Sequence, residues 1–118
     1  MKLSVYVDGS GGDNSGYGFF VKETGESFHE KKPGITNNQA EYLAIISALE
    51  RLGGQDHTIT IYSDSKNTVS QLNHEFAINS EILRELARQA WSIMGKIPNL
   101  KIVWIPRAQN LAGKMLGS

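Results

Sequence analysis

Cysteine is absent from the 118 residues of this sequence, and its absence excludes disulfides and thiolate metal sites. Carboxylates and the three histidines are the side chains left to hold a metal ion. Long apolar runs are also missing: none approaches the roughly 18 to 20 residues that cross a bilayer, and the N-terminus lacks the apolar segment of a signal peptide. We therefore expect a cytoplasmic protein that does not contact membranes.

An excess of charge of either sign is missing too, since twelve basic and twelve acidic residues cancel. This balance argues against a protein that holds nucleic acid by bulk charge alone. The distribution is uneven, because the segment from Lys96 onwards carries four basic residues and no acid. That segment would face a phosphate backbone while the rest supplies an acidic site, or the asymmetry is a chance excess on a solvated face. On charge alone the second interpretation is favoured.

Segments of alternating and β-branched residues predict five strands, over residues 3–7, 17–22, 26–31, 58–62 and 100–105. Glycine-containing turns join the first three strands into an antiparallel meander. Apolar residues at three- and four-residue spacing predict helices over 38–52, 65–72 and 80–95, with Asn38 as the N-cap of the first. The order βββαβααβ, with another helix beginning near the C-terminus, predicts one layered α/β domain over residues 1–118.

The core can be predicted in part from the same pattern. Trp91 and Trp104 are expected to pack in the core. The buried side of the helix over 80–95 is expected to carry six apolar residues: Ile82, Leu83, Leu86, Ala90, Ile93 and Met94. The histidines, at positions 29, 57 and 74, fall on a strand, a loop and a helix end, so they form no ligand pair and we assign them no chemistry.

Three acids stand at comparable places in these elements. Asp8 follows the first strand, Asp64 follows the fourth, and Glu41 lies in the first turn of the long helix. Ligands of open α/β sheets bind outside the carboxyl ends of the strands, so these acids are expected to share one crevice. Crowded carboxylates are unfavourable unless they are protonated or bridged by a cation. Mg²⁺ or Mn²⁺ is the ion that such an all-oxygen group binds.

Each acid also has an ordinary structural explanation. Asp64 would be the N-cap of the helix that follows, and Asp8 with Gly9 would form a turn. Glu41 would be the reciprocal partner of Asn38 in a capping box. It is the joint arrangement of the three, rather than any one of them, that favours a metal site.

Longer motifs surround these acids. The strings YVDGSGGDNSGYG, GITNNQAEYLAIISALE and IYSDSKNTV, continued by WIPRAQNLAGKML, resemble the motifs of the ribonuclease H family in order and position over nearly the whole chain. The resemblance implies a five-stranded mixed sheet, three strands antiparallel and then two parallel, flanked by helices. It implies that Asp8, Glu41 and Asp64 are three of the four metal-binding acids of the family. It also points to the small form of the family without a basic protrusion, because no loop is inserted before Lys96.

The fourth acid of the family is missing. The family pattern resembles RxxNxxAD, with the acid four residues after the Asn, whereas this chain has Asn110 followed by Lys114. Glu85 is the last acidic residue, so no local carboxylate substitutes. Lys114 would either pair with Asp8 or Asp64, giving low activity or a preference for Mn²⁺, or lie clear of a site for which three carboxylates suffice.

The activity implied by the resemblance is metal-dependent endonucleolytic hydrolysis of the RNA strand of an RNA/DNA hybrid, leaving 5′-phosphate products. Two metal ions about 3.5 to 4 Å apart would clamp the displacement, with Asp8 as the bridging ligand and Glu41 near the ribose 2′-hydroxyl. The resemblance places Thr36 and Asn14 at the DNA-strand phosphate and Asn37 and Asn38 at the minor groove. It extends the substrate-binding set to the backbone and side chains of Gly9, Ser10 and Arg107.

These substrate residues have structural explanations as well, since a TNN segment leads naturally into a helix and glycines make turns. Without a basic protrusion, a monomer would bind the hybrid weakly and in a salt-sensitive way unless a partner or another domain contributes. Two alternative functions remain open at this point. One is a hybrid- or double-stranded-RNA-binding module with weakened catalysis, and the other is a different nuclease or strand-transfer enzyme of the same superfold.

Overall fold

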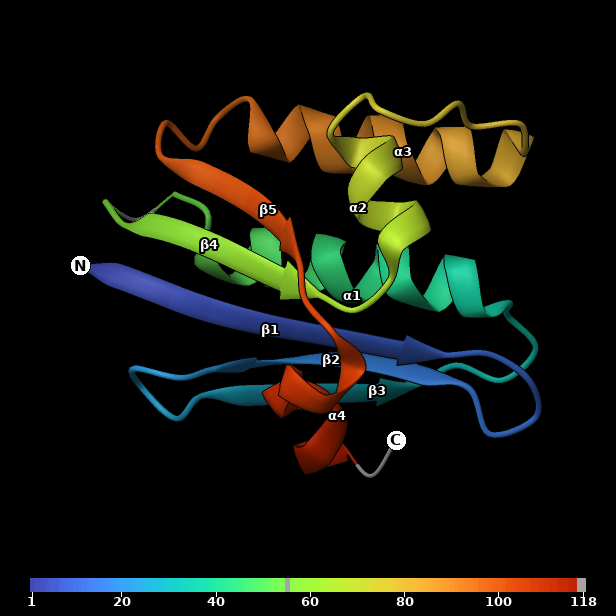
Figure 1. The fold of residues 1–118 in the computed structure, drawn as a ribbon, viewed down its shortest axis with the longest axis horizontal. Helices are drawn as coiled ribbons and strands as arrows, with labels where there is room; N and C mark the ends of the chain where they lie inside the picture. The colour runs from blue at the N-terminus through green and yellow to red at the C-terminus, as the bar shows by residue number, and fades with distance from the viewer. Residues whose placement is uncertain (55, 117–118) are drawn as a thin grey trace.

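The structure, a computed structural model, describes residues 1–54 and 56–116, and it describes side chains as far as Gly113. Its elements follow the expected order and are coloured along the chain in Figure 1. The strands are β1 (Lys2–Ser10), β2 (Gly16–Val21), β3 (Ser27–Lys31), β4 (Thr58–Ser63) and β5 (Leu100–Trp104). The helices are α1 (Asn37–Leu52), α2 (Lys66–Leu72), α3 (Glu81–Met94) and, after a 3₁₀ turn over Arg107–Gln109, α4 (Leu111–Leu116).

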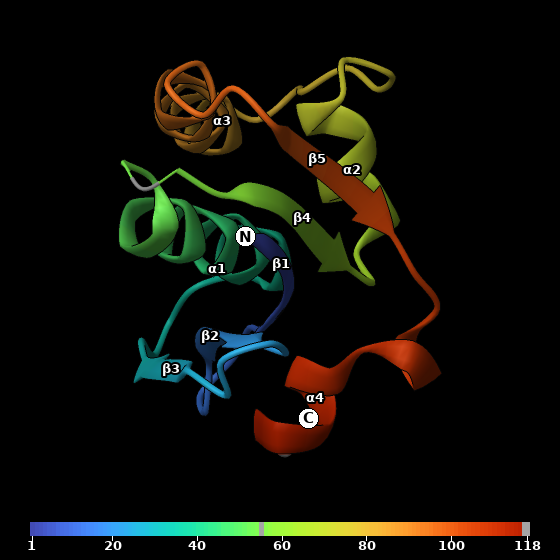
Figure 2. The same cartoon turned by 90° about the vertical axis from the view of Figure 1, so that its left-hand side faces the viewer.

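The five strands form one mixed sheet in the order β3-β2-β1-β4-β5. The first three are antiparallel, β4 runs parallel to β1, and β5 runs parallel to β4. Helix α1 packs on β1 and β2, and α3 packs on α1. Figure 2 shows these two helices on one side of the sheet and α4 on the other. The α/β fold expected from the sequence, with its five-stranded mixed sheet, is confirmed.

The first helix begins earlier than expected, and its cap is Thr36 rather than Asn38. The Thr36 hydroxyl accepts a hydrogen bond from the Gln39 N–H at 3.1 Å, and the Gln39 side chain accepts one from the Thr36 N–H at 2.8 Å. This reciprocal pair satisfies two backbone donors that the first turn of a helix leaves open. The expected role of Asn38 as a cap was therefore wrong, and Glu41 lies just beyond the first turn rather than within it.

Strand β1 is longer than the predicted segment 3–7. Its pairing with β2 continues to Ser10, which lies opposite Gly16. Asp8 is therefore inside a strand and not in a turn after it, so the turn explanation of this residue was wrong. Pairing between two glycine-containing segments carries no alternating apolar signal, and for this reason the sequence pattern could not show where β1 ends.

The core lies between the sheet and α1. Alternate residues of β1 are buried there, and the buried side of α1 is rich in alanine, isoleucine and leucine. On α3, Ala87 and Ala90 are fully buried, whereas Ile82 is 58% exposed, so its assignment to the core was wrong. Trp91 packs against the core, but Trp104 is 45% exposed and its expected burial was also wrong. Among the described residues, no helix is both long and apolar enough to span a membrane.

Candidate metal centre

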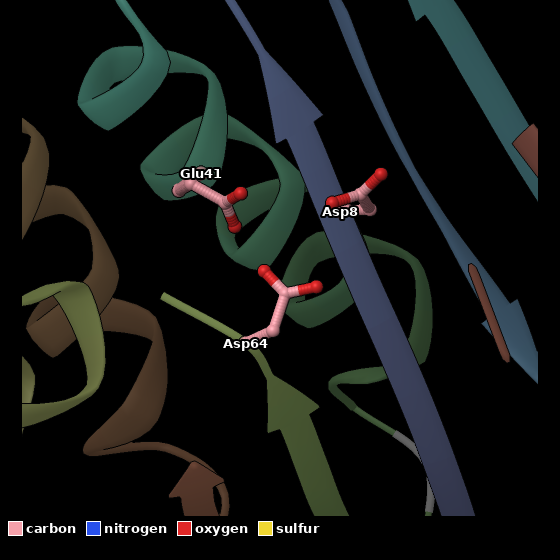
Figure 3. A group of neighbouring side chains, drawn as sticks. All are labelled: Asp8, Glu41 and Asp64. Atoms are coloured by element: carbon pink, nitrogen blue, oxygen red, sulfur yellow. The ribbon is translucent and has the colours of Figure 1, made fainter. Parts of the chain in front are cut away.

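Asp8, Glu41 and Asp64 come together as the sequence predicted. Each contributes a carboxylate oxygen to a group in which these atoms lie within 4.8 Å of one another. Figure 3 shows the three side chains gathered where β1 and α1 meet the end of β4. Asp8 and Glu41 are only 3% and 6% exposed, and Asp64 is half-buried. Such a group brings three carboxyl groups into a poorly hydrated space.

The two aspartates are neighbours because of strand register. Tyr6 of β1 pairs with Tyr62 of the parallel strand β4. Asp8 follows Tyr6 by two residues on the same face of β1, and Asp64 follows Tyr62 by two residues, directly after β4 ends. Asp64 does not cap α2, since Ser65 accepts the hydrogen bond from the Thr68 N–H at 3.4 Å. The N-cap explanation of Asp64 was therefore wrong.

Glu41 reaches the aspartates because α1 passes very close to β1 at Gly9. A Cβ atom on Gly9 would lie 2.4 Å from the carbonyl carbon of Ala40, which only glycine avoids. The Gly9 N–H donates to Glu41 Oε1 at 3.3 Å. Glu41 is also not the capping-box partner of the helix, because Gln39 has that position.

The electrostatics of the group are those of a cation site. Burial, followed by the charges of Asp8 and Asp64, raises the pKa of Glu41 to about 8, while the Gly9 N–H and the charge of Arg107 act in the opposite direction. Glu41 Oε2 is buried and has no hydrogen-bond partner among the described residues. A buried carboxylate oxygen left without a donor is unfavourable, and a hard divalent cation would satisfy it. The residues present thus fit a divalent metal ion.

Asn110 is a further residue of the site that the sequence did not single out. It is fully buried, and its Nδ2 donates to the Val7 carbonyl at 2.8 Å and to Asp64 Oδ2 at 3.0 Å. Its Oδ1 accepts from the Ala112 N–H at 3.0 Å. Asn110 therefore ties the C-terminal segment to both metal-site strands. The sequence signal for Asn110 was its match to the Asn of the RxxNxxAD-like motif. That motif was used only to locate the missing fourth acid.

Most of the predicted substrate residues lie where the end of β1 and the β1–β2 loop meet the start of α1, beside the acids. The Gly11 N–H donates to Asn37 Oδ1 at 2.5 Å, and the Gly12 N–H donates to the Ile35 carbonyl at 3.1 Å. These contacts join the β1–β2 loop to the segment leading into α1. The exposed polar residues of these segments are Ser10, Asn14, Thr36, Asn37 and Asn38.

Two basic residues named in the sequence predictions lie in the C-terminal segment, after β5. Arg107 is exposed in the 3₁₀ turn, close enough for its charge to lower the pKa of Glu41. Lys114 lies in α4, but its side chain is outside the described residues, so its pairing with Asp8 or Asp64 stays a prediction. Among the described residues, no second group of three acids or histidines is arranged to hold a metal.

Known proteins that are similar to this chain agree with the resemblance of its motifs to the ribonuclease H family. The family model described as "Reverse transcriptase-like" matches residues 21–117. A curated protein of Enterococcus faecalis named "Putative hydrolase EbsB" is 28% identical over 122 residues, which cover 97% of this chain and 90% of that protein.

Solved structures are similar over almost the whole chain. The crystal structure of RNase H1 from the halophilic archaeon Halobacterium salinarum has a TM-score of 0.87 at 28% identity, covering 98% of this chain and 94% of that one. LC11-RNase H1, crystallised in complex with an RNA/DNA hybrid, has a TM-score of 0.85 at 28% identity, covering 97% and 92%.

Proposed function

This chain belongs to the reverse transcriptase-like family and is a member of the ribonuclease H family, and from that premise we propose that it is a metal-dependent endonuclease that hydrolyses the RNA strand of RNA/DNA hybrids. The carrying observation is the group formed by Asp8, Glu41 and Asp64, with one buried Glu41 oxygen left without a donor. The similarity to a ribonuclease H1 crystallised with a hybrid supports the choice of substrate.

The metal is Mg²⁺ or Mn²⁺, because the donor group offers only carboxylate oxygens. A divalent ion held there supplies a Lewis acid that activates water and stabilises the leaving oxygen. The chain's own contribution is to present the three acids in a fixed arrangement. Strand register and Asn110 hold the two aspartates, and the contact at Gly9 holds Glu41.

Substrate binding falls to the polar side chains around the acids. Hydroxyl and amide groups of Ser10, Asn14 and the Thr36–Asn38 segment are exposed beside the group and suit hydrogen bonding to phosphate and sugar oxygens. The Thr36 hydroxyl accepts its hydrogen bond from the Gln39 N–H and keeps its own proton to donate. Exposed Arg107 supplies a positive charge at the rim.

Lys114 favours a second candidate function. It stands where the family carries its fourth acid, and a cation there would lower the affinity of the site for a metal ion. The chain would then keep its fold and its nucleic-acid surface and act as a hybrid- or double-stranded-RNA-binding module with weak cleavage.

Cleavage of an end-labelled hybrid with Mg²⁺, with Mn²⁺ and with EDTA tests the two functions. The endonuclease predicts metal-dependent shortening of the RNA strand, lost in Asp8→Asn and retained in Asp56→Asn, an exposed acid at the other end of β4. Binding without cleavage by both the unaltered chain and Asp8→Asn would establish the binding module instead. Parallel reactions on duplex DNA and duplex RNA identify a different nuclease of the same superfold if either is cut faster than the hybrid.

A further inference from the structure

The sheet face opposite α1 carries a second group of side chains next to the metal centre. On β1 and β4 the core residues alternate with Ser4, Tyr6, Thr60 and Tyr62, which are only half-buried. Residues that alternate along a strand point to opposite faces, so these four face away from α1. Figure 2 places α4 on this side of the sheet, but its contacts are with β1 and β2. Within the described residues, no helix covers β4 and β5 there.

A stacked aromatic pair lies at the centre of this face. The rings of Tyr6 and Tyr62 are 5.0 Å apart between centroids and inclined by 22°. Tyr62 pairs with Tyr6 on one side and with Val103 of β5 on the other. Since one ring face of Tyr62 rests on Tyr6, the other is turned toward β5, where the neighbouring side chain is much smaller. Tyr62 is half-buried and lines a groove on that side, so part of its ring is accessible there.

That ring borders a groove of about 450 Å³ over β1, β4, β5 and the loop at residues 98–99. We call it the β1–β4–β5 groove and define it by the side chains that carry the argument: Lys2, Ser4, Thr58, Thr60, Tyr62 and Lys101. Ser4, Thr60 and Lys101 are aligned across the three strands by the sheet register. The groove therefore combines an aromatic face with a row of hydroxyls and two ammonium groups.

The charge of the groove differs from that of the whole chain. Its lining includes two lysines and no acid, whereas acids and bases are equal in number over the sequence. An acid borders the groove at β1: Glu23 Oε1 accepts a hydrogen bond from the Ser4 N–H at 2.6 Å, and its charge acts on Tyr6. On the β4 and β5 side the lining residues include Lys101 and no acid. Lysines spaced along a groove are the arrangement that neutralises successive phosphates.

We propose that the β1–β4–β5 groove binds single-stranded RNA, with one base stacked on Tyr62 and the flanking phosphates at Lys2 and Lys101. Aromatic side chains on an exposed sheet face stack unpaired bases because every base has a π face. The hydroxyls of Ser4, Thr58 and Thr60 both donate and accept hydrogen bonds, as the ribose 2′-hydroxyl does, and this favours RNA over DNA. The inference rests on the proposed function only in that the polymer is a nucleic acid.

The groove lies next to the metal centre, so RNA bound in it would be close to the acids. Asp8 lies two residues beyond Tyr6 on the same face of β1, about 7 Å along the strand. Asp64 follows directly after β4, two residues beyond Tyr62. An unpaired RNA segment in the groove would thus run alongside the metal centre. The chain would hold a hybrid by its single-stranded RNA extension and gain affinity that its few exposed basic residues at the acids do not provide.

Fluorescence anisotropy with a labelled RNA of about 12 nucleotides, in EDTA and low salt, tests the proposal separately from cleavage, since no metal is present. The full chain is expected to bind, Tyr62→Phe to bind equally well, and Tyr62→Leu to bind roughly tenfold more weakly because the stacking face is lost. Lys101→Gln is expected to weaken binding severalfold and to reduce its salt dependence. Phe76→Leu, which alters an exposed aromatic residue outside the groove, is the matched control.

Three outcomes overturn the proposal: no binding of RNA by the full chain, equal loss in Phe76→Leu, or DNA of the same sequence bound as tightly as RNA. If Tyr62→Leu fails to fold, as judged by thermal unfolding, the exposed Lys101→Gln and a Lys2→Gln, Lys101→Gln double variant decide it. Unchanged binding in both lysine variants would exclude the groove. Because hydrolysis plays no part in these measurements, a chain that binds RNA but cuts no hybrid still supports the groove.

Discussion

At the scale of single residues, the unusual property of the molecule is the protonation of Glu41. Burial is the main reason why the pKa of Glu41 is raised from its ordinary value of 4.5 to about 8 in the folded chain. Between these values the unfolded chain has lost a proton that the folded chain retains. The free energy of unfolding therefore falls as the pH rises from 4.5 to 8 in the absence of metal. The stabilising contribution is complete below pH 4.5 and is lost through pH 8.

Glu41→Gln removes this titration, so we predict that the metal-free variant is more stable than the unaltered chain near pH 8, by on the order of 1–3 kcal/mol. Because the amide cannot ionise, the free energy of unfolding of Glu41→Gln should vary less between pH 5 and pH 8 than that of the unaltered chain. Thermal unfolding in EDTA at the two pH values measures both quantities. Equal pH dependence in the two proteins would contradict the assignment of the titration to Glu41.

Asn110 gives the second prediction at this scale. Asn110→Ala removes the donors to Asp64 and to the Val7 carbonyl from a fully buried position. We expect the free energy of unfolding to fall by about 1–3 kcal/mol, and metal affinity to fall further than stability explains. Calorimetric titration with Mn²⁺ on folded protein separates the two effects. The control is Asn73→Ala, which removes another side-chain hydrogen bond to a strand carbonyl, away from the acids. An equal loss of metal affinity in Asn73→Ala would count against a role of Asn110 in positioning Asp64.

At the scale of elements, the close contact between β1 and α1 determines whether the acids meet. Gly9→Ala would place a Cβ within 2.4 to 2.7 Å of the Ala40 and Glu41 backbone. The helix must then move away from the strand, and Glu41 moves with it. We predict a loss of at least about 2 kcal/mol of stability and of metal binding. Thermal unfolding and titration measure these, with Gly95→Ala as the control, since its Cβ would meet nothing closer than 3.5 Å.

Lys114 lies in the last helix, α4, and its effect on metal binding can be tested by substitution. If its ammonium opposes the metal, Lys114→Asp should raise the rate of hybrid cleavage, and its Mg²⁺ rate should approach its Mn²⁺ rate. Restoring an acid on α4 adds an oxygen ligand at the position that the family motif reserves for one. Rates with each metal give the answer. An unchanged or lower rate in Lys114→Asp, with metal affinity also unchanged in Lys114→Ala, would mean that three carboxylates suffice.

These elements also mark the limits of prediction from sequence. The acids were found because strand ends and motif strings are local features, and both survive in a single sequence. The cap at Thr36 was missed because Thr36 and Asn38 are both good caps, and the choice depends on Gln39. Asn110 was missed because its partners lie 103 and 46 residues away. Exposure of Trp104 could not be predicted, since it depends on β5 being the edge strand.

At the scale of the whole molecule, the equal numbers of acids and bases govern how a hybrid binds. Three of the twelve acids form the metal centre. Lys32, Lys66 and Arg107 are exposed basic residues on the segments that lead into α1, follow Asp64 and precede α4. Each phosphate that a basic residue neutralises releases condensed counterions. A chain with few such contacts therefore binds weakly. Its affinity falls with salt, but less steeply than that of a protein with many phosphate contacts.

We predict a slope of about −3 for the logarithm of the hybrid association constant against that of salt concentration, or roughly a 60-fold loss between 50 and 200 mM. Arg107→Gln should bring the slope about one unit closer to zero, because one phosphate contact is lost. Lys96→Gln, at an exposed lysine beyond the end of α3, should leave it unchanged. Anisotropy of a blunt labelled hybrid in EDTA measures each slope. A slope steeper than about −6 would require a far larger basic surface, and equal slopes in the two variants would remove Arg107 from the hybrid interface.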